Sequence, residues 1–365
     1  MTGIAIDIGT TTIQAQLVDL DTGIILETFS ALNNQRCFGA DIMSRISAAQ
    51  NGKLNELFSI VNSQIENILL YFLKKYNLSS ISKCIVSGNT VMLHIFCNID
   101  PSGMGVSPYT PVFLQEKFFP GKELSLSAEN IILLPAISAF IGADITAGLT
   151  VVDFINKKED SIFIDIGTNG EIAVWKEKEK RLFCCSTAAG PCFEETGISC
   201  GLNASDFINV IAEMKYRGAI DKTGALTGEY AETGYPVIGN SGFITQKDVR
   251  QFQLAKSAII SGIKTICKIS GFNLKNTGTV YIAGGIGFHI NLDNAVNSGL
   301  LPQEFTDSSG IKTEVCGNTS LKGAVKCLNT PDFLQLCRKI ISCAETADLA
   351  NDKYFTAAFL YNMEF

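Results

Sequence analysis

Alternating apolar and polar positions open the chain and return near its middle. The runs share a period of two and are separated by tight Gly, Asp or Thr turns, which predicts short antiparallel β-strands. They lie at residues 3–9, 12–20, 23–32, 161–168, 171–179 and 181–190. The same three-strand pattern therefore occurs once in each half of the chain.

Helical periodicity follows each set of strands. Residues 54–73 carry apolar side chains in steps of three and four, which predicts one apolar helix face. The further predicted elements are strands at 83–89, 130–136 and 279–287, and helices from Thr90 and at 142–154, 205–217, 247–270 and 319–328. Three strands followed by alternating helix and strand thus occur twice, which predicts an α/β protein with two lobes. We expect lobes at 1–155 and 156–345, with 346–365 packing back on them.

Composition narrows the class of protein. The 365 residues are 46% hydrophobic and 18% charged, as expected for a large globular interior. The net charge of −7 makes nucleic acid a poor partner. The 12 cysteines show no metal-binding spacing, and the first residues lack the pattern of a secretory leader, so we expect a cytoplasmic protein. The most apolar stretch, 131–152, is interrupted by Pro135 and Asp144, so no membrane span is expected.

Two similar loops carry the candidate chemistry. Asp7 ends the first strand and is followed by Gly9, Thr10, Thr11 and Thr12; Asp165 ends the matching strand and is followed by Gly167, Thr168, Asn169 and Gly170. Glycine lets the backbone approach a phosphate, and N–H and hydroxyl groups can donate to its oxygens. Asp7 and Asp165 suit Mg²⁺ held through water. The alternative is that both loops are ordinary hairpin turns.

A third motif runs from a strand into glycines. Tyr281–Ala283 lead into Gly284 and Gly285, a turn that suits the adenosine end of a nucleotide. In this order the three motifs resemble the superfamily of actin, sugar kinases and heat-shock-chaperone ATPases. The resemblance implies two ribonuclease-H-like lobes around a nucleotide cleft that binds ATP and Mg²⁺. It also implies that Asp144 orients the attacking water, although an Asp there can instead be a helix N-cap.

Several short sequence motifs are more specific than the three motifs of the superfamily. They are Phe38–Ile46, Ser87–His94 with Ile99–Ser102, Leu134–Ile137 with Gly142–Asp144, Asp165–Glu171 with Ser186–Glu194, Gln246–Ile263 and Phe355–Phe365. Together they resemble the C-terminal ATPase portion of the reductive activators of corrinoid proteins. This resemblance implies ATP-dependent return of a corrinoid from cobalt(II) to cobalt(I), with the corrinoid protein of a methyltransferase system as partner. It places Gly190 and Glu194 near the adenosine and makes a homodimer possible.

The sequence departs from that family in one respect. Typical members carry an iron–sulfur domain, and no cluster-binding spacing is present here. We therefore expect no iron–sulfur cluster in this chain and a separate low-potential electron donor; a cluster shared across a dimer through Cys192 and Cys200 is the alternative. His94 is expected to be an interior residue, with corrinoid ligation as its other interpretation. A small-molecule kinase and an ATP-gated binding module remain the rival functions.

Overall fold

The computed structural model describes residues 1–365 except 194–200, 238–241, 286–289 and 307–309. Contacts divide the chain into two compact units. Unit 1 comprises Met1–Phe154 and Thr319–Ala344, and unit 2 comprises Ile155–Asn318 and Glu345–Phe365. Among the described residues, no helix combines the length and the apolar character needed to cross a bilayer.

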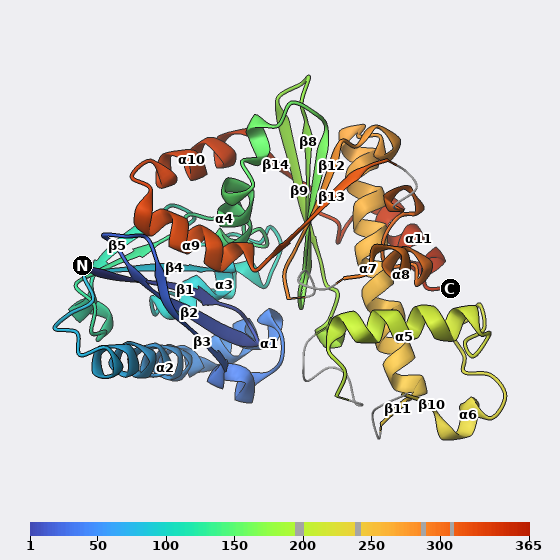
Figure 1. Ribbon diagram of the computed structural model, residues 1–365, viewed down its shortest axis with the longest axis horizontal. Helices are drawn as coiled ribbons and strands as arrows, with labels where there is room; N and C mark the ends of the chain where they lie inside the picture. The colour runs from blue at the N-terminus through green and yellow to red at the C-terminus, as the bar shows by residue number, and fades with distance from the viewer. Residues whose placement is uncertain (194–200, 238–241, 286–289, 307–309) are drawn as a thin grey trace. The chain divides into compact units, whose positions relative to one another are not determined.

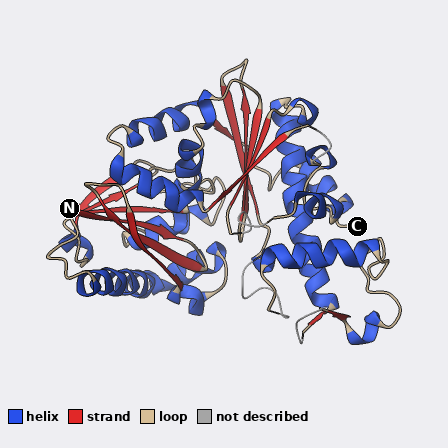
Figure 2. Ribbon diagram, viewed as in Figure 1, coloured by secondary structure: helices blue, strands red, loops and turns tan. Residues whose placement is uncertain are grey.

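Unit 1 is a six-stranded sheet with helices on both faces (Figure 1, Figure 2). Its strands are β1 (Thr2–Ile8), β2 (Thr12–Asp19), β3 (Ile25–Leu32), β4 (Lys83–Gly88), β5 (Lys117–Pro120) and β6 (Asn130–Leu133). Its helices are α1 (Ile42–Ala48), α2 (Leu54–Lys75), α3 (Thr90–Phe96), α4 (Ala143–Val151), α9 (Thr319–Asn329) and α10 (Phe333–Cys343). The strand order is β3-β2-β1-β4-β6-β5, and β1, β4 and β6 run parallel to one another.

The sequence pattern explains this arrangement. Ile4, Ala5 and Ile6 of β1 are wholly buried, as expected for a central strand covered on both faces. The predicted apolar stripe of α2 is buried through residues such as Val61 and Ile65. In Figure 1, α2 lies on one side of the sheet, while α4 and α9 lie on the other.

Unit 2 repeats the same sheet. Its strands are β7 (Ser161–Ile166), β8 (Gly170–Lys176), β9 (Arg181–Thr187), β12 (Thr279–Ala283), β13 (Lys312–Gly317) and β14 (Ala344–Thr346), with a separate ribbon of β10 (Tyr235–Pro236) and β11 (Phe243–Ile244). Its helices are α5 (Ala204–Tyr216), α6 (Tyr230–Thr233), α7 (Gln246–Ser270), α8 (Leu292–Asn297) and α11 (Lys353–Tyr361). The order β13-β12-β7-β8-β9 matches β6-β4-β1-β2-β3 of unit 1. The predicted α/β class with two ribonuclease-H-like lobes is confirmed.

One boundary differs from the sequence prediction. We expected residues 156–345 to form the second lobe, but α9 and α10 belong to unit 1. The reason is close helix packing, because a Cβ added to Gly323 of α9 would lie 2.5 Å from the Cβ of Ala147 in α4. The last residues pack on α7 in unit 2, where Lys256 Nζ donates to the carbonyls of Asn362 (2.7 Å) and Glu364 (2.6 Å).

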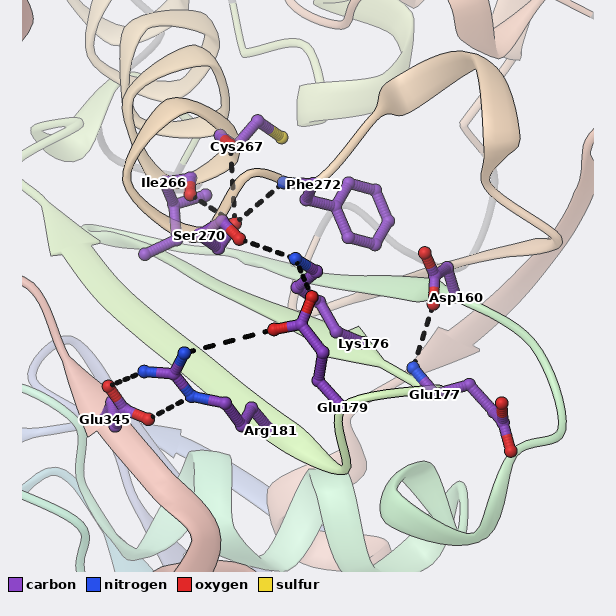
Figure 3. A network of polar contacts seen from close by, with 10 residues as sticks. All are labelled: Asp160, Lys176, Glu177, Glu179, Arg181, Ile266, Cys267, Ser270, Phe272 and Glu345. Carbon is purple, nitrogen blue, oxygen red and sulfur yellow. Dashed lines mark hydrogen bonds and ion pairs between the residues drawn. The ribbon is translucent and has the colours of Figure 1, made fainter.

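The hairpin of β8 and β9 is tied to the end of α7 and to the segment at Glu345 in unit 2 (Figure 3). Lys176 Nζ donates to the Ser270 carbonyl at the end of α7 (2.9 Å), which satisfies a helix C-terminal acceptor. Arg181 forms a bidentate pair with Glu345 through two 2.7 Å hydrogen bonds. Glu345 is where the chain returns to unit 2, so this pair fastens the returning segment beside β9.

Candidate nucleotide site

Parallel strand ends place the first candidate aspartate. Asp7 of β1 lies opposite Ser87 of β4 in the parallel ladder, one residue before β1 ends. Ligands of open α/β sheets bind beyond the carboxyl ends of parallel strands, at the point where the strand order changes direction. Asp7 is half-buried there, at the centre of the unit 1 sheet.

The first loop is a tight turn whose carbonyl groups are held inward. Gly9 N–H donates to the Thr12 carbonyl (3.0 Å), and a Cβ at Gly9 would lie 2.6 Å from that oxygen, so only glycine fits. The wholly buried Asn33 donates from its side-chain amide to Gly9 O (2.9 Å) and from its backbone to Thr11 O (2.7 Å). Thr10 Oγ1 accepts from Asn89 Nδ2 (3.1 Å). Asn33 was missed by sequence analysis.

Asp144 lies in the first turn of α4, close enough to Asp7 to interact with it electrostatically. The N-cap of α4 is Gly142, so the alternative that Asp144 is the N-cap is wrong. A Cβ at Gly142 would lie 2.6 Å from the Asn89 Cα, which shows that the starts of α3 and α4 meet beside the loop. Burial, and then the negative charge of Asp7, raise the pKa of Asp144 to about 7.

Ser320 completes this cluster from a distant part of the chain. Its hydroxyl lies 2.7 Å from Asp7 Oδ1, to which it donates, and 2.9 Å from Ser87 Oγ. Ser320 is in the first turn of α9, where the helix dipole favours a nearby carboxylate. Sequence analysis missed it, because no local pattern connects residues 313 positions apart.

Unit 2 repeats the design around Asp165. Asp165 of β7 lies opposite Ala283 of β12, and Gly167 N–H donates to the Asn169 carbonyl two residues later (2.9 Å), whereas Gly9 N–H in the first loop donates to the Thr12 carbonyl three residues later. Gly284 follows β12 with φ +92°, and a Cβ there would lie 2.6 Å from Asp165 Oδ1. The structure therefore brings Gly284 against Asp165.

The other residues of unit 2 that were predicted to bind ATP lie in the turn after β7 and beyond the ends of β9 and β12. Thr168 and Asn169 are half-buried at the turn, and Gly170 begins β8. Gly285 is exposed beyond β12, and no atom of the described residues would lie within 4 Å of a Cβ placed on it. Gly190 adopts φ +78° after β9. Glu194 and Cys200 lie outside the described residues. The assignment of all these residues to ATP stays a prediction.

The carboxylates suit a cation that keeps part of its water shell. The described residues contain no group of three or more His, Cys, Asp or Glu side chains placed to hold a metal ion. Asp7 and Asp144 form a pair whose mutual repulsion a cation would relieve. Mg²⁺ is commonly held by one or two carboxylates together with phosphate and water. The donor set thus fits Mg²⁺ arriving with a nucleotide.

The buried cysteines and His94 lie in surroundings that do not favour metal binding. Burial raises the pKa of the Cys192 and Cys185 thiols, which disfavours the thiolate that binds metal. His94 is wholly buried, and its ring stacks on Phe113 with centroids 4.2 Å apart. Its Nδ1 donates to Thr90 O (2.7 Å), and its Nε2 accepts from the Val112 amide (3.1 Å). The interior interpretation is confirmed, and both ring nitrogens are engaged within unit 1.

Acidification should destabilise the protein through His94. Burial lowers its pKa from 6.5, so the folded state prefers the neutral ring. The stability this gives is present above pH 6.5 and is lost as the pH falls below it. Between pH 7.5 and 5.5 we expect a loss of about 1 kcal/mol in unfolding free energy that is absent in His94→Gln. Denaturant titrations at both pH values measure it; identical pH dependence in both proteins would contradict this prediction.

Two matching sheets, each with an Asp-x-Gly loop after its first strand, define an ASKHA-fold protein, the class of actin and the sugar kinases. The chain belongs to the RACo family: the RACo middle region matches residues 2–157, and the C-terminal ASKHA domain of RACo matches 159–209 and 205–365. The predicted resemblance to reductive activators of corrinoid proteins is confirmed at this level.

Named relatives agree with the family. The corrinoid activation enzyme RamQ of Eubacterium limosum is 27% identical, with 100% of this chain and 70% of RamQ covered. A Co(II) methylated amine-specific corrinoid protein reductase of Methanosarcina barkeri is 26% identical, with 100% and 77% covered. The solved structure of a reductive activator for corrinoid, iron-sulfur protein is 29% identical with a TM-score of 0.90, and this chain spans 66% of its length.

Proposed function

We propose that this chain binds and hydrolyses MgATP to drive the reductive reactivation of a corrinoid protein from cobalt(II) to cobalt(I). Support comes from the family and from relatives whose names describe corrinoid activation or reduction. In this proposal a separate low-potential donor supplies the electron. ATP supplies the free energy for a reduction that is uphill for ordinary cellular donors.

The Asp7–Asp144 pair beside the first loop is the observation that carries the proposal. Asp144 has its pKa raised to about 7, which suits a group that accepts a proton at neutral pH. The loop beside it is held with its carbonyls inward, which favours phosphate on its N–H side. A structural Asp at a helix start needs neither feature.

Each candidate site residue has its own role in the proposed hydrolysis of ATP. In this proposal, backbone N–H groups of the two loops would hold the phosphates, and Asp7 and Asp165 would hold Mg²⁺ through water. When bound, Mg²⁺ would supply positive charge that stabilises the phosphates. Asp144 orients the attacking water and takes its proton as the new oxygen–phosphorus bond forms and the bond to the ADP oxygen breaks.

The chain connectivity offers a route for coupling. Asn318 is the last residue of its segment in unit 2, and Ser320, two positions later, donates to Asp7 in unit 1. Binding or loss of a ligand at Asp7 would therefore act, through the hydrogen bond to Ser320, on the peptide segment that joins the two units. Such a link can bias a two-state domain arrangement when ATP is bound or lost.

A mixed assay tests the corrinoid step. This protein is combined with MgATP, titanium(III) citrate as one-electron donor, and a methyltransferase corrinoid protein prepared as cobalt(II). We expect the cobalt(I) absorbance to appear with ATP and not with ADP. Each ATP should give one ADP and one free phosphate. Absence of an ATP-dependent cobalt(I) signal with corrinoid partners would contradict the proposal, and phosphate found on a small molecule would indicate a kinase.

A further inference from the structure

Arg45 is a fully buried charge directly behind the first loop. Its side chain is 0% exposed, and it belongs to the Phe38–Ile46 motif, which the proposed nucleotide contacts leave unexplained. Arginine keeps its charge in proteins, and burying a charge is costly unless something nearby gains from it. A group of this kind so close to a candidate phosphate loop therefore calls for a role.

The motif encodes the placement of Arg45. Asp41 is the N-cap of α1, accepting a hydrogen bond from Ser44 N–H (2.8 Å). Gly39 has φ +133°, and a Cβ there would lie 2.5 Å from Ser44 Oγ, so a side chain would collide with α1. This tight entry brings the Gly39 carbonyl to Arg45, which donates to it from Nε (3.3 Å) and Nη2 (3.0 Å).

The guanidinium then reaches the loop itself. Arg45 Nη2 donates to the Thr10 carbonyl (3.1 Å), and Nη1 donates to Gln35 Oε1 (3.0 Å). Gln35 is also wholly buried, and its N–H donates to Asn33 Oδ1 (3.0 Å). Since Asn33 holds the carbonyls of Gly9 and Thr11, one buried polar network fixes three successive carbonyls of the loop.

This arrangement orients the opposite side of each peptide. In a trans peptide the C=O and the next N–H point in opposite directions. Holding the carbonyls of Gly9, Thr10 and Thr11 toward the network therefore turns the N–H groups of Thr10, Thr11 and Thr12 away from it. That is the orientation a phosphate-binding loop needs, formed before any ligand arrives.

We propose that Arg45 is a positioning residue that presets the first loop for phosphate and adds a fixed positive charge behind it. The proposal rests on the proposed function, in which this loop binds ATP phosphates. It predicts that Arg45 contributes to affinity in proportion to the phosphate count of the nucleotide. A residue needed only for stability would affect all adenine nucleotides equally.

The test compares nucleotides within each variant. Arg45→Met removes the charge and the donors, while Arg45→Lys keeps the charge but cannot contact three acceptors in the same way. Calorimetry with Mg²⁺ gives the affinities for ATP, ADP and AMP. We expect Arg45→Met to bind ATP about 10- to 100-fold more weakly, ADP less so, and AMP almost as wild type does. Arg45→Lys should fall between.

Controls separate the possible failures. Arg36→Met removes an equal charge from an exposed position nine residues earlier and should leave ATP affinity unchanged. If Arg45→Met does not fold, the test is the ratio of ATP affinity to AMP affinity in Arg45→Lys. An unchanged ratio in the folded variants would overturn the role of Arg45 alone. Failure of the wild type to bind ATP would overturn the proposed function as well.

Discussion

Replacing Asp144 by asparagine is expected to lower kcat for ATP hydrolysis by about 10²- to 10⁴-fold while ATP affinity stays nearly constant. Asparagine keeps the size and hydrogen bonding of the side chain but cannot accept a proton from water. Steady-state phosphate release gives kcat, and calorimetry gives affinity. Asp153→Asn makes the same chemical change at an exposed residue just beyond α4 and should leave both quantities unchanged.

The same substitution should stabilise the nucleotide-free protein. Burial and Asp7 raise the pKa of Asp144 from 3.8 to about 7, so its carboxyl opposes folding increasingly as the pH rises between these values, and the full cost is present above pH 7. At pH 8 we expect Asp144→Asn to increase the unfolding free energy by about 1–2 kcal/mol. Unchanged turnover would exclude Asp144 as the catalytic group, and an inactive but less stable variant would point to a structural role.

Adding one methyl group at Gly284 is expected to reduce ATP affinity by about 10-fold or more through Asp165. The Cβ would lie 2.4 Å from the Ile166 carbonyl oxygen and 2.6 Å from Asp165 Oδ1, at a backbone φ of +92° that alanine seldom adopts. Strain of this kind costs about 1–3 kcal/mol, so either the strand end or the carboxylate must move. Calorimetry of Gly284→Ala with MgATP measures the loss, and wild-type affinity would contradict the predicted contact with Asp165.

Gly285→Ala is the matched variant for comparison with Gly284→Ala. Among the described residues, no atom would lie within 4 Å of a Cβ at this position, so we expect the folded protein to tolerate alanine with unchanged thermal stability. Any loss of nucleotide affinity would then come from contact between the added methyl group and the ligand, as expected if this turn approaches the adenosine. If Gly285→Ala binds ATP and ADP as the wild type does, the predicted adenosine contact at Gly285 is wrong.

The fold was largely accessible from the sequence because its determinants are local. Period-two runs became β1, β2 and β3 and then β7, β8 and β9, and the apolar stripe at 54–73 became α2. Repetition of that order predicted two lobes. β13 was missed because it is an edge strand with a mostly polar, partly exposed sequence, Lys312–Gly317, that lacks the apolar signal of a buried strand.

The candidate site was predictable only where the backbone determines it. Glycines at 9 and 284 are required by close approach or positive φ, and such positions leave a signature in sequence. Ser320 and Asn33 left none, because hydroxyl and amide side chains serve in many turns and their partners are set by tertiary packing. The assignment of α9 to unit 1 was missed for the same reason, since helical periodicity gives a face but not its partner.

The stoichiometry of MgATP binding tests the central claim most directly. If both loops serve one nucleotide, calorimetry should give one ATP per chain, and Gly9→Val or Gly167→Val should each abolish that binding. Thermal unfolding without nucleotide would confirm that both variants are folded. No binding by the wild type, two ATP per chain, or full binding by a folded variant of either loop would contradict the claim that Asp7 and Asp165 serve a single ATP.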